Sequence, residues 1–245
     1  PLVTVRIHAH TPQELVTYAS ETLKDGGGMP AFFNDDQLIP ALEDLGIDTE
    51  DARDYTNDGC WEIIIPGRTD FKFQRLSLML CLEWALNRGI TRLTGAQEGL
   101  DTGDPTDFQT FADVWDAFTE QLKHMIDETS RQVCEKIDER SVYAPVPLLS
   151  ALIEGAIPAG TDMTAGGAKY RTHGMLAESV AHTIDSLTAI QRVVFEDRAV
   201  DIGEVCASLA DDFVGYERVQ RLLHDAPKYG NDDPYADDMG KRVMG

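Results

Sequence analysis

The sequence has little cysteine and no long apolar run. No stretch of about eighteen apolar residues occurs, so a membrane-spanning helix is not expected. The N-terminus also lacks the basic-then-apolar layout of a secretory signal peptide. The cysteines are Cys60, Cys81, Cys134 and Cys206. They form neither a CxxC pair nor a cysteine-histidine cluster with zinc spacing. These absences indicate a cytoplasmic protein in a reducing compartment, without a disulfide framework or a structural metal.

Basic residues are scarce relative to acidic ones. The chain has 21 Lys and Arg against 43 Asp and Glu, which gives a formal net charge of -22. Nucleic acids and anionic membranes both require a basic surface, so we expect neither as a partner.

The length of 245 residues and the hydrophobic content of 42% are sufficient for a substantial core. No internal repeat or low-complexity linker divides the sequence, so we interpret it as a portion of one domain. The chain begins at Pro1 without an initiator Met and stops at Gly245. We therefore expect it to be a piece of a longer polypeptide.

The first sixty residues alternate between strand and helix patterns. Residues 2–9 read as a strand and are followed by a helix to about residue 24, and residues 29–33 read as a buried strand followed by a helix that ends near residue 46. This alternation is typical of an α/β fold with parallel strands. Further on, the spacing predicts helices over about residues 76–87, 108–139, 148–155, 176–195, 202–213 and 216–224, followed by a polar tail.

The tetrapeptide Gly-Cys-Trp-Glu at residues 59–62 carries the most specific chemistry. In extended backbone, an i, i+2 spacing puts Cys60 and Glu62 on the same face of the segment. A sulfur that removes a hydrogen atom from carbon, beside a base that removes a proton from a neighbouring hydroxyl, can drive loss of a vicinal leaving group. The alternative is a buried cysteine with Glu62 as a surface charge.

Other candidate residues fit structural roles better. His8 and His10 share one face of a strand but have no third ligand nearby, so no metal site is predicted. His173, in the Gly-rich segment 164–174, is a weaker candidate for a site residue on a loop. The three cysteines other than Cys60 occur among apolar neighbours in helical patterns, so we expect them in the core.

Segments in sequence order resemble the glycyl radical enzymes of the pyruvate formate-lyase-like superfamily. They include GGGMPAFFNDDQLIPAL, EDARDYTNDGCWE, LLSALIEGAIPAGTDMTAGGAKY, DSLTAIQRVVFED and APKYGNDDPYAD, which together cover nearly the whole chain. The resemblance implies an α/β fold, as a portion of a ten-stranded α/β barrel with the cysteine loop in its interior and long peripheral helices. Residues 1–245 would then be part of one pyruvate formate-lyase-like domain.

The resemblance also implies roles for individual residues. Cys60 would be the thiyl radical site and Glu62, the acid of the GCxE motif, the general base of the dehydratase and lyase branch. Trp61, Phe73 and Gln74 are candidate substrate contacts; Trp61 either shapes the pocket or packs behind the loop, and the other two are expected in the loop after the motif. No metal ligand is implied.

Two departures from the family pattern matter. The radical-storing glycine of the family lies in a C-terminal motif similar to RVxGY, and the terminal GKRVMG does not match it, so the glycyl radical domain is expected to be absent and the piece by itself inactive. Enzymes of the pyruvate formate-lyase type proper have two adjacent cysteines, whereas Trp61 follows Cys60 here. This difference favours the eliminating branch.

The implied function is therefore that of a lyase of anaerobic metabolism that eliminates a vicinal group from a small hydroxylated substrate. The alternatives are a formate acetyltransferase-like carbon-carbon lyase or decarboxylase of the same superfamily, and a non-catalytic truncated relative. No cofactor is expected to bind this chain, because the glycyl radical would reside in the absent domain. The implied partners are a radical S-adenosylmethionine activating enzyme, which installs the radical, and a second copy in a homodimer. The substrate and its leaving group stay open.

Overall fold

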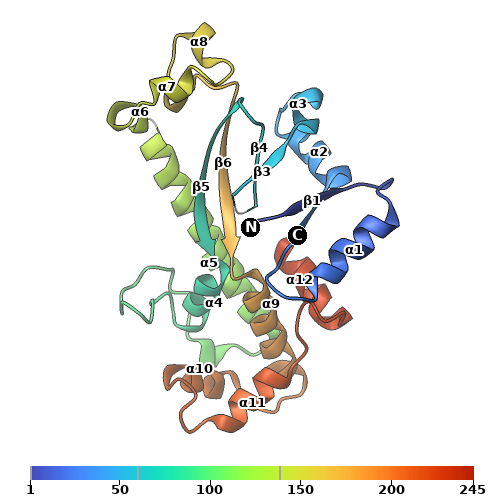
Figure 1. The fold of residues 1–245 in the computed structure, drawn as a ribbon. Coiled ribbons are helices and arrows are strands. Elements are labelled where there is room, and N and C mark those ends of the chain that lie inside the picture. Colours follow the sequence, from blue (N-terminus) through green and yellow to red (C-terminus); the bar gives the residue numbers. More distant parts are fainter. Residues whose placement is uncertain (1, 60, 138) are drawn as a thin grey trace. The chain divides into compact units, whose positions relative to one another are not determined.

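The computed structural model describes residues 2–59, 61–137 and 139–245, and the chain divides into two compact units. Unit 1 combines Pro1–Phe73 with Lys136–Gly174, and unit 2 combines Gln74–Glu135 with Met175–Gly245. Figure 1 shows the elements of both units coloured along the sequence.

Unit 1 opens with a parallel β-α-β arrangement. Strand β1 (Thr4–Ile7) and strand β2 (Ala31–Asn34) pair in parallel, and helix α1 (Gln13–Leu23) connects them. Helix α2 (Asp35–Asp44) follows directly, and the Asn34 side chain caps it by accepting a hydrogen bond from the backbone N–H of Asp36. The predicted order of strand, helix, strand and helix is confirmed here.

A short helix and a hairpin come next in unit 1. Helix α3 (Thr49–Arg53) leads into strands β3 (Thr56–Asp58) and β4 (Glu62–Ile64), which pair antiparallel. A small apolar core supports this hairpin, made of the buried residues Leu42, Ile47, Ala52, Tyr55 and Ile65. Burial of these side chains anchors both ends of the hairpin, because Tyr55 precedes β3 and Ile65 follows β4.

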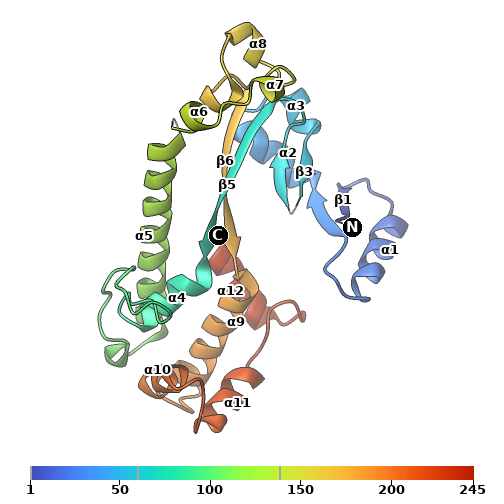
Figure 2. The same ribbon diagram turned by 60° about the vertical axis from the view of Figure 1, so that its left-hand side comes forward.

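Strands β5 (Thr69–Ser77) and β6 (Tyr170–Glu178) form a two-stranded sheet, seen clearly as a long ribbon in Figure 2. The ends of these strands, from Gln74 and from Met175 on, are counted with unit 2. The other elements of unit 1 are short: α6 (Arg140–Tyr143), α7 (Pro147–Ser150), α8 (Ala156–Ala159) and the 3-10 turn η2 (Met163–Ala165). The helix predicted over residues 148–155 is wrong beyond residue 150. A turn replaces it before Gly155, whose φ of 99° does not fit a helix.

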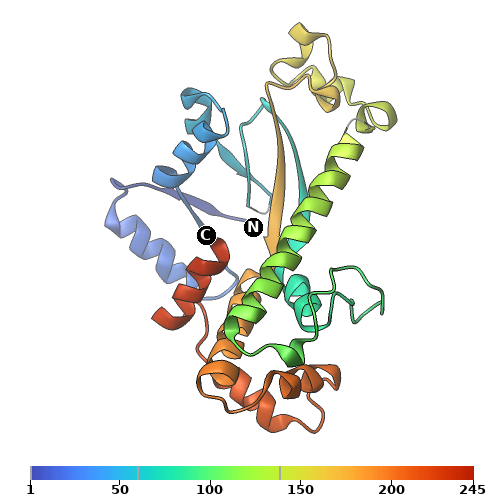
Figure 3. The ribbon, with the colours of Figure 1, turned by 180° about the vertical axis from the view of Figure 1, so that it is seen from behind.

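Unit 2 is helical. Its elements include α4 (Leu78–Leu86), the 3-10 turn η1 (Pro105–Asp107), most of α5 (Phe111–Ile137), α9 (Val180–Ala189), the π-helical segment η3 (Ile190–Glu196), α10 (Ile202–Ala210), α11 (Glu217–Asp225) and α12 (Pro234–Met244). The core of unit 2 lies between these helices, and Val114, Phe118, Ile184 and Leu187 are at most 1% exposed. Figure 3 shows α5 as one uninterrupted helix. The helix predicted over about residues 108–139 is therefore confirmed as α5, and Val114 and Phe118 lie on its buried face.

Helix α12 lies where the sequence predicted a polar tail. Asp233 caps it by accepting from the backbone N–H of Tyr235, and Pro234 occupies its first turn. An Asp followed by Pro is a helix-start signal, because the carboxylate satisfies a free N–H and Pro has none to satisfy. The buried side chains Ala236 and Met239 then attach α12 to unit 2.

The strands confirm the α/β class at a coarse level. Within the described residues, the strands form three two-stranded sheets, of which β1–β2 is parallel and β3–β4 antiparallel. These sheets do not by themselves close a barrel. Also within the described residues, the helices include none with the length and hydropathy needed to cross a bilayer.

Gln121 gives a stability prediction for unit 2. Its amide is fully buried, accepts from the Leu100 N–H at 2.9 Å and donates to the Leu100 carbonyl at 2.7 Å. Gln121→Leu leaves both backbone groups without their partner, so we expect a loss of about 2 kcal/mol in the free energy of unfolding. Urea denaturation measures this loss. The exposed Gln132→Leu on the same helix is the control and should change stability by less than about 0.5 kcal/mol.

Candidate active site

The segments on either side of the predicted cysteine loop form the β3–β4 hairpin. Asp58 and Glu62 face each other as the last pair of the antiparallel ladder. Gly59 has a φ of 45°, in the left-handed region that disfavours residues with a side chain. Cys60 lies outside the described residues, so its shared face with Glu62 stays a prediction.

Glu62 is the first residue of β4 and is half-buried. Its Oε2 accepts a hydrogen bond from the backbone N–H of Trp61 at 3.0 Å. The carboxylate therefore turns back toward the loop that carries Cys60, and does not extend away along the strand. A general base must reach the proton that it removes, so the role of Glu62 as a base beside Cys60 stays a prediction.

The three candidate substrate contacts are placed differently from one another. The Trp61 residue is 39% exposed, so it is not packed deeply behind the loop. Phe73 and Gln74 lie in strand β5, so their expected location in a loop is wrong. Phe71 and Phe73, two positions apart, stack with ring centroids 6.2 Å apart, and this aromatic alternation is the strand signal that was missed. Since neighbouring side chains of a strand point to opposite faces, Phe73 and Gln74 cannot both face one ligand.

Arg6, which the sequence did not single out, holds the entry to the hairpin. Its Nη1 donates to the carbonyl oxygens of Arg53 at 3.1 Å and Tyr55 at 3.0 Å. Its Nε and Nη2 donate to the Asp35 carboxylate at 2.8 and 2.9 Å, and the Tyr55 hydroxyl donates to the same carboxylate at 2.6 Å. Burial opposes ionisation of Asp35, but the hydrogen bonds from Arg6 and Tyr55 hold its pKa below the usual value.

His173 lies in strand β6, not in a loop as expected. Burial lowers the pKa of this imidazole, and the neighbouring Asp70 carboxylate opposes that shift. Asp70 is itself buried and binds Arg140 Nη1 at 2.9 Å and Arg171 Nε at 3.6 Å. His173 is thus near a satisfied ion-pair cluster, and none of these contacts involves the cysteine hairpin.

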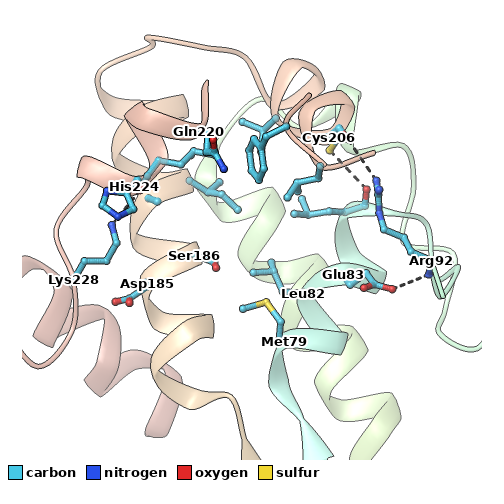
Figure 4. A pocket seen from close by; sticks show the side chains of 17 residues that line it. Met79, Leu82, Glu83, Arg92, Asp185, Ser186, Cys206, Gln220, His224 and Lys228 are labelled. Carbon is cyan, nitrogen blue, oxygen red and sulfur yellow. Dashed lines mark hydrogen bonds between the residues drawn. The ribbon is translucent and has the colours of Figure 1, made fainter. Parts of the chain in front are cut away.

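Unit 2 contains an apolar pocket of about 440 Å³ between α4, α9, α10 and α11 (Figure 4). Its wall includes Met79 and Leu82, and several of its polar groups are engaged within the protein. The backbone N–H of Arg92 donates to Glu83 at 2.8 Å, and the Cys206 thiol donates to the Leu86 carbonyl at 3.7 Å. Burial raises the pKa of Cys206 to about 11, which disfavours the thiolate. None of the predicted site residues lines this pocket, so it is not the candidate active site.

The cysteines other than Cys60 differ in burial. Cys81 is fully buried and donates to the Met125 sulfur at 3.6 Å, and Cys206 is half-buried, so a packing role fits both. Cys134 is exposed, so the expected core location is wrong for this residue. It lies on α5 after the last buried residue in the described part of this helix, near the exposed ion pair of Arg131 and Glu135.

Thiol labelling should separate these cysteines. Burial raises the pKa of Cys81 to about 12 and that of Cys206 to about 11. In the folded protein carrying Cys60→Ala, we expect Cys134 to react with iodoacetamide at pH 8, and the other two thiols to react at least about 100-fold more slowly because little thiolate is present. Mass spectrometry of timed samples measures the three rates. If the three thiols react at comparable rates in the folded protein, and unfolding does not change these rates, the assignment of Cys81 and Cys206 as buried thiols is contradicted.

Comparison with known proteins identifies the family. The family model described as pyruvate formate lyase-like matches residues 1–245. The chain is 34% identical to trans-4-hydroxy-L-proline dehydratase of Clostridioides difficile over 100% of this chain and 31% of that protein. It is 32% identical to isethionate sulfite-lyase of Oleidesulfovibrio alaskensis, over 99% of this chain and 30% of that protein.

A solved structure agrees with this result. The glycyl radical enzyme from Archaeoglobus fulgidus superposes with a TM-score of 0.84 and 31% identity, over 100% of this chain and 31% of that chain. The chain therefore belongs to the pyruvate formate lyase-like family. It spans about a third of the length of these relatives.

Proposed function

We propose that this chain is the cysteine-bearing portion of a longer glycyl radical dehydratase or lyase that acts on a small hydroxylated substrate. The observation that carries the proposal is the Glu62 carboxylate, which hydrogen-bonds the backbone of the loop that holds Cys60. Membership in the family and the names of relatives that eliminate water or sulfite support it. The remaining length of those relatives leaves room for a glycyl radical domain outside this chain.

The reaction follows from the chemistry of the two side chains. The Cys60 thiyl radical removes a hydrogen atom from the substrate carbon that bears a hydroxyl, which forms the thiol and a carbon radical. The Glu62 carboxylate takes the hydroxyl proton, and the resulting radical anion expels the vicinal group with its bonding electron pair. The product radical then takes back the hydrogen atom from Cys60, which regenerates the thiyl radical. Glu62 acts as a general base in this sequence.

The unpaired electron would be supplied by a glycyl radical in the longer enzyme, installed by a radical S-adenosylmethionine activating enzyme. We further propose that the chain is part of one domain with a ten-stranded barrel in which the cysteine loop lies inside. Such an interior excludes water and oxygen from the radical. A homodimer is the proposed assembly.

The second candidate, a formate acetyltransferase-like carbon-carbon lyase or decarboxylase, is less well supported by the loop. Acyl transfer in that type of enzyme uses a second thiol beside the radical cysteine, and Trp61 occupies that position. Elimination requires only Cys60 and an adjacent base. The loop therefore favours the dehydratase or lyase.

The test is a substrate screen of the complete enzyme, activated anaerobically until electron paramagnetic resonance shows a glycyl radical. The panel contains small diols, amino alcohols, hydroxysulfonates and hydroxyprolines, and products are identified by mass spectrometry. Release of water, amine or sulfite with formation of a carbonyl compound supports the proposal. An imine formed from a hydroxyproline supports elimination but moves the hydrogen abstraction to the carbon beside the ring nitrogen. With a 2-oxo acid and a carboxylic acid added to the panel, formate together with an acyl product, or carbon dioxide together with the decarboxylated compound, would favour the second candidate instead. A protein that cannot acquire a radical would be the non-catalytic relative.

A further inference from the structure

Two sequence blocks that the reaction does not use meet in unit 1. They are Asp-Ala-Arg-Asp-Tyr at residues 51–55, ahead of the hairpin, and Gly-Gly-Ala-Lys-Tyr at residues 166–170, at the start of β6. Lys169 Nζ lies 2.6 Å from Asp51 Oδ2, although 118 residues separate them in sequence. The Tyr170 hydroxyl donates to the same oxygen, also at 2.6 Å. The second block thus holds the first through one carboxylate.

Asp51 is suited to this role because it is buried. The residue is 6% exposed and accepts hydrogen bonds or ion pairs from three side chains: Lys169, Tyr170 and Arg68. The hydrogen bonds from Lys169 and then Tyr170 hold its pKa below the usual value, although burial opposes this shift. Charge-assisted hydrogen bonds are stronger and shorter than neutral ones, so this carboxylate fixes its donors in place.

Arg68 closes the base of the hairpin from the other side. It follows β4 after the turn at Pro66 and Gly67, whereas Asp51 and Asp54 precede β3. Its Nη1 lies 3.0 Å from Asp51 and 3.2 Å from Asp54, and its Nε donates to Glu154 at 2.8 Å. Entry and exit of the hairpin are therefore joined through one guanidinium.

Backbone contacts make the joint rigid. The N–H of Tyr170 donates to the Arg68 carbonyl at 2.9 Å, and the N–H of Lys169 donates to the Glu154 carbonyl at 2.8 Å. Gly167 permits this approach, since a Cβ there would lie 2.0 Å from the Thr161 carbonyl oxygen. Close backbone packing thus explains Gly167, and the left-handed φ of 93° explains Gly166, in the turn that presents Lys169 and Tyr170 to Asp51.

We propose that Asp51, through Arg68, Lys169 and Tyr170, is the positioning residue that fixes the loop of Cys60 and Glu62. This inference rests on the proposed function for its kinetic consequence, but the structural part stands on the contacts alone. None of the four residues is assigned to touch substrate. Their role is to hold the legs of the hairpin so that the sulfur and the carboxylate keep one relative geometry.

The first test is hydrogen exchange of Asp51→Asn, which keeps the size of the side chain and removes its charge. We expect amides of residues 56–64 to exchange at least 10-fold faster than in the parent. Tyr170→Phe, which loses only one donor, should show a smaller acceleration and covers the case in which Asp51→Asn fails to fold. Gln121→Leu is the control for general destabilisation, because it acts in unit 2 without touching the hairpin. The proposal would be overturned if the exchange rates of these amides were unchanged in both Asp51→Asn and Tyr170→Phe. It would also be overturned if Gln121→Leu accelerated their exchange equally.

The second test is kinetic and uses the activated complete enzyme. Turnover is divided by the glycyl radical content of each sample, so that loss of folded protein does not count. We expect kcat per radical to fall at least 10-fold in Asp51→Asn with KM nearly unchanged, and not to fall in Gln121→Leu. If kcat per radical does not fall in Asp51→Asn, but turnover of the enzyme depends on Cys60, the positioning role is refuted and the proposed function is not. An enzyme with no turnover dependent on Cys60 refutes the proposed function, and hydrogen exchange then still decides whether Asp51 holds the hairpin.

Discussion

Cys60→Ala in the activated complete enzyme is expected to abolish turnover, by at least about 10⁴-fold, the scale on which loss of an essential reacting side chain acts. Residues 56–64 contain no second cysteine, so no other side chain of the hairpin can form a thiyl radical. The proposed glycyl radical should persist, because Cys60 would act only after that radical has been formed. Product formation measured by mass spectrometry, with the radical quantified by electron paramagnetic resonance in the same sample, gives both values.

Cys134→Ala is the matched control for this experiment. Cys134 is exposed and lies on α5, away from the β3–β4 hairpin in sequence, so its removal should leave turnover within about 2-fold of the parent. Retained turnover in Cys60→Ala would refute the assignment of the radical site. Loss of the radical signal together with turnover would indicate instead a failure of activation.

The first part of the fold could be predicted from local sequence signals. The order of β1, α1, β2 and α2 follows from alternating apolar residues, a capping residue and a glycine run, all of which act within a few residues. Strands β5 and β6 were missed because their polar residues, such as Lys72, Arg75 and Arg171, hide the aromatic alternation. Strand β5 carries that local aromatic signal, but the pairing of β5 with β6, about a hundred residues away in sequence, cannot be predicted from either segment alone.

The candidate site shows the same division. The cysteine and its acid were predicted from a tetrapeptide, because the chemistry requires those residue types close together. The Asp51 contacts with Lys169 and Tyr170 could not be predicted from spacing, since they form only when residues 118 and 119 positions apart meet. Arg6 was missed for the same reason, since an arginine in an alternating strand gives no sign of the carbonyl groups that it binds.

Glu62→Gln is expected to lower kcat by about 10² to 10⁴-fold, the range in which general bases contribute, while KM changes little. The amide keeps the size of the side chain and can still accept from the Trp61 N–H, so the loop should keep its shape. It cannot take a proton, and elimination should therefore stop after the hydrogen atom has been removed. Steady-state kinetics of the activated enzyme measure the loss. Glu178→Gln is the control and should stay near the parent rate, because Glu178 is a half-buried residue of β6 that pairs with Arg75 at 3.2 Å and lies outside the hairpin.

Solvent deuterium distinguishes loss of the base from loss of the radical site. In Glu62→Gln the carbon radical is stalled, so the Cys60 thiol has time to exchange its proton with solvent when the interior opens, before the hydrogen returns to carbon. Unreacted substrate recovered from deuterium oxide should therefore gain deuterium with Glu62→Gln and gain none with Cys60→Ala. If Glu62→Gln gains none and is also inactive, the carboxylate is needed for hydrogen abstraction or for binding, and its role as the base of the elimination is wrong. If it retains full turnover, another group removes the proton, and the hydrogen bond from Trp61 to Glu62 serves only to shape the loop.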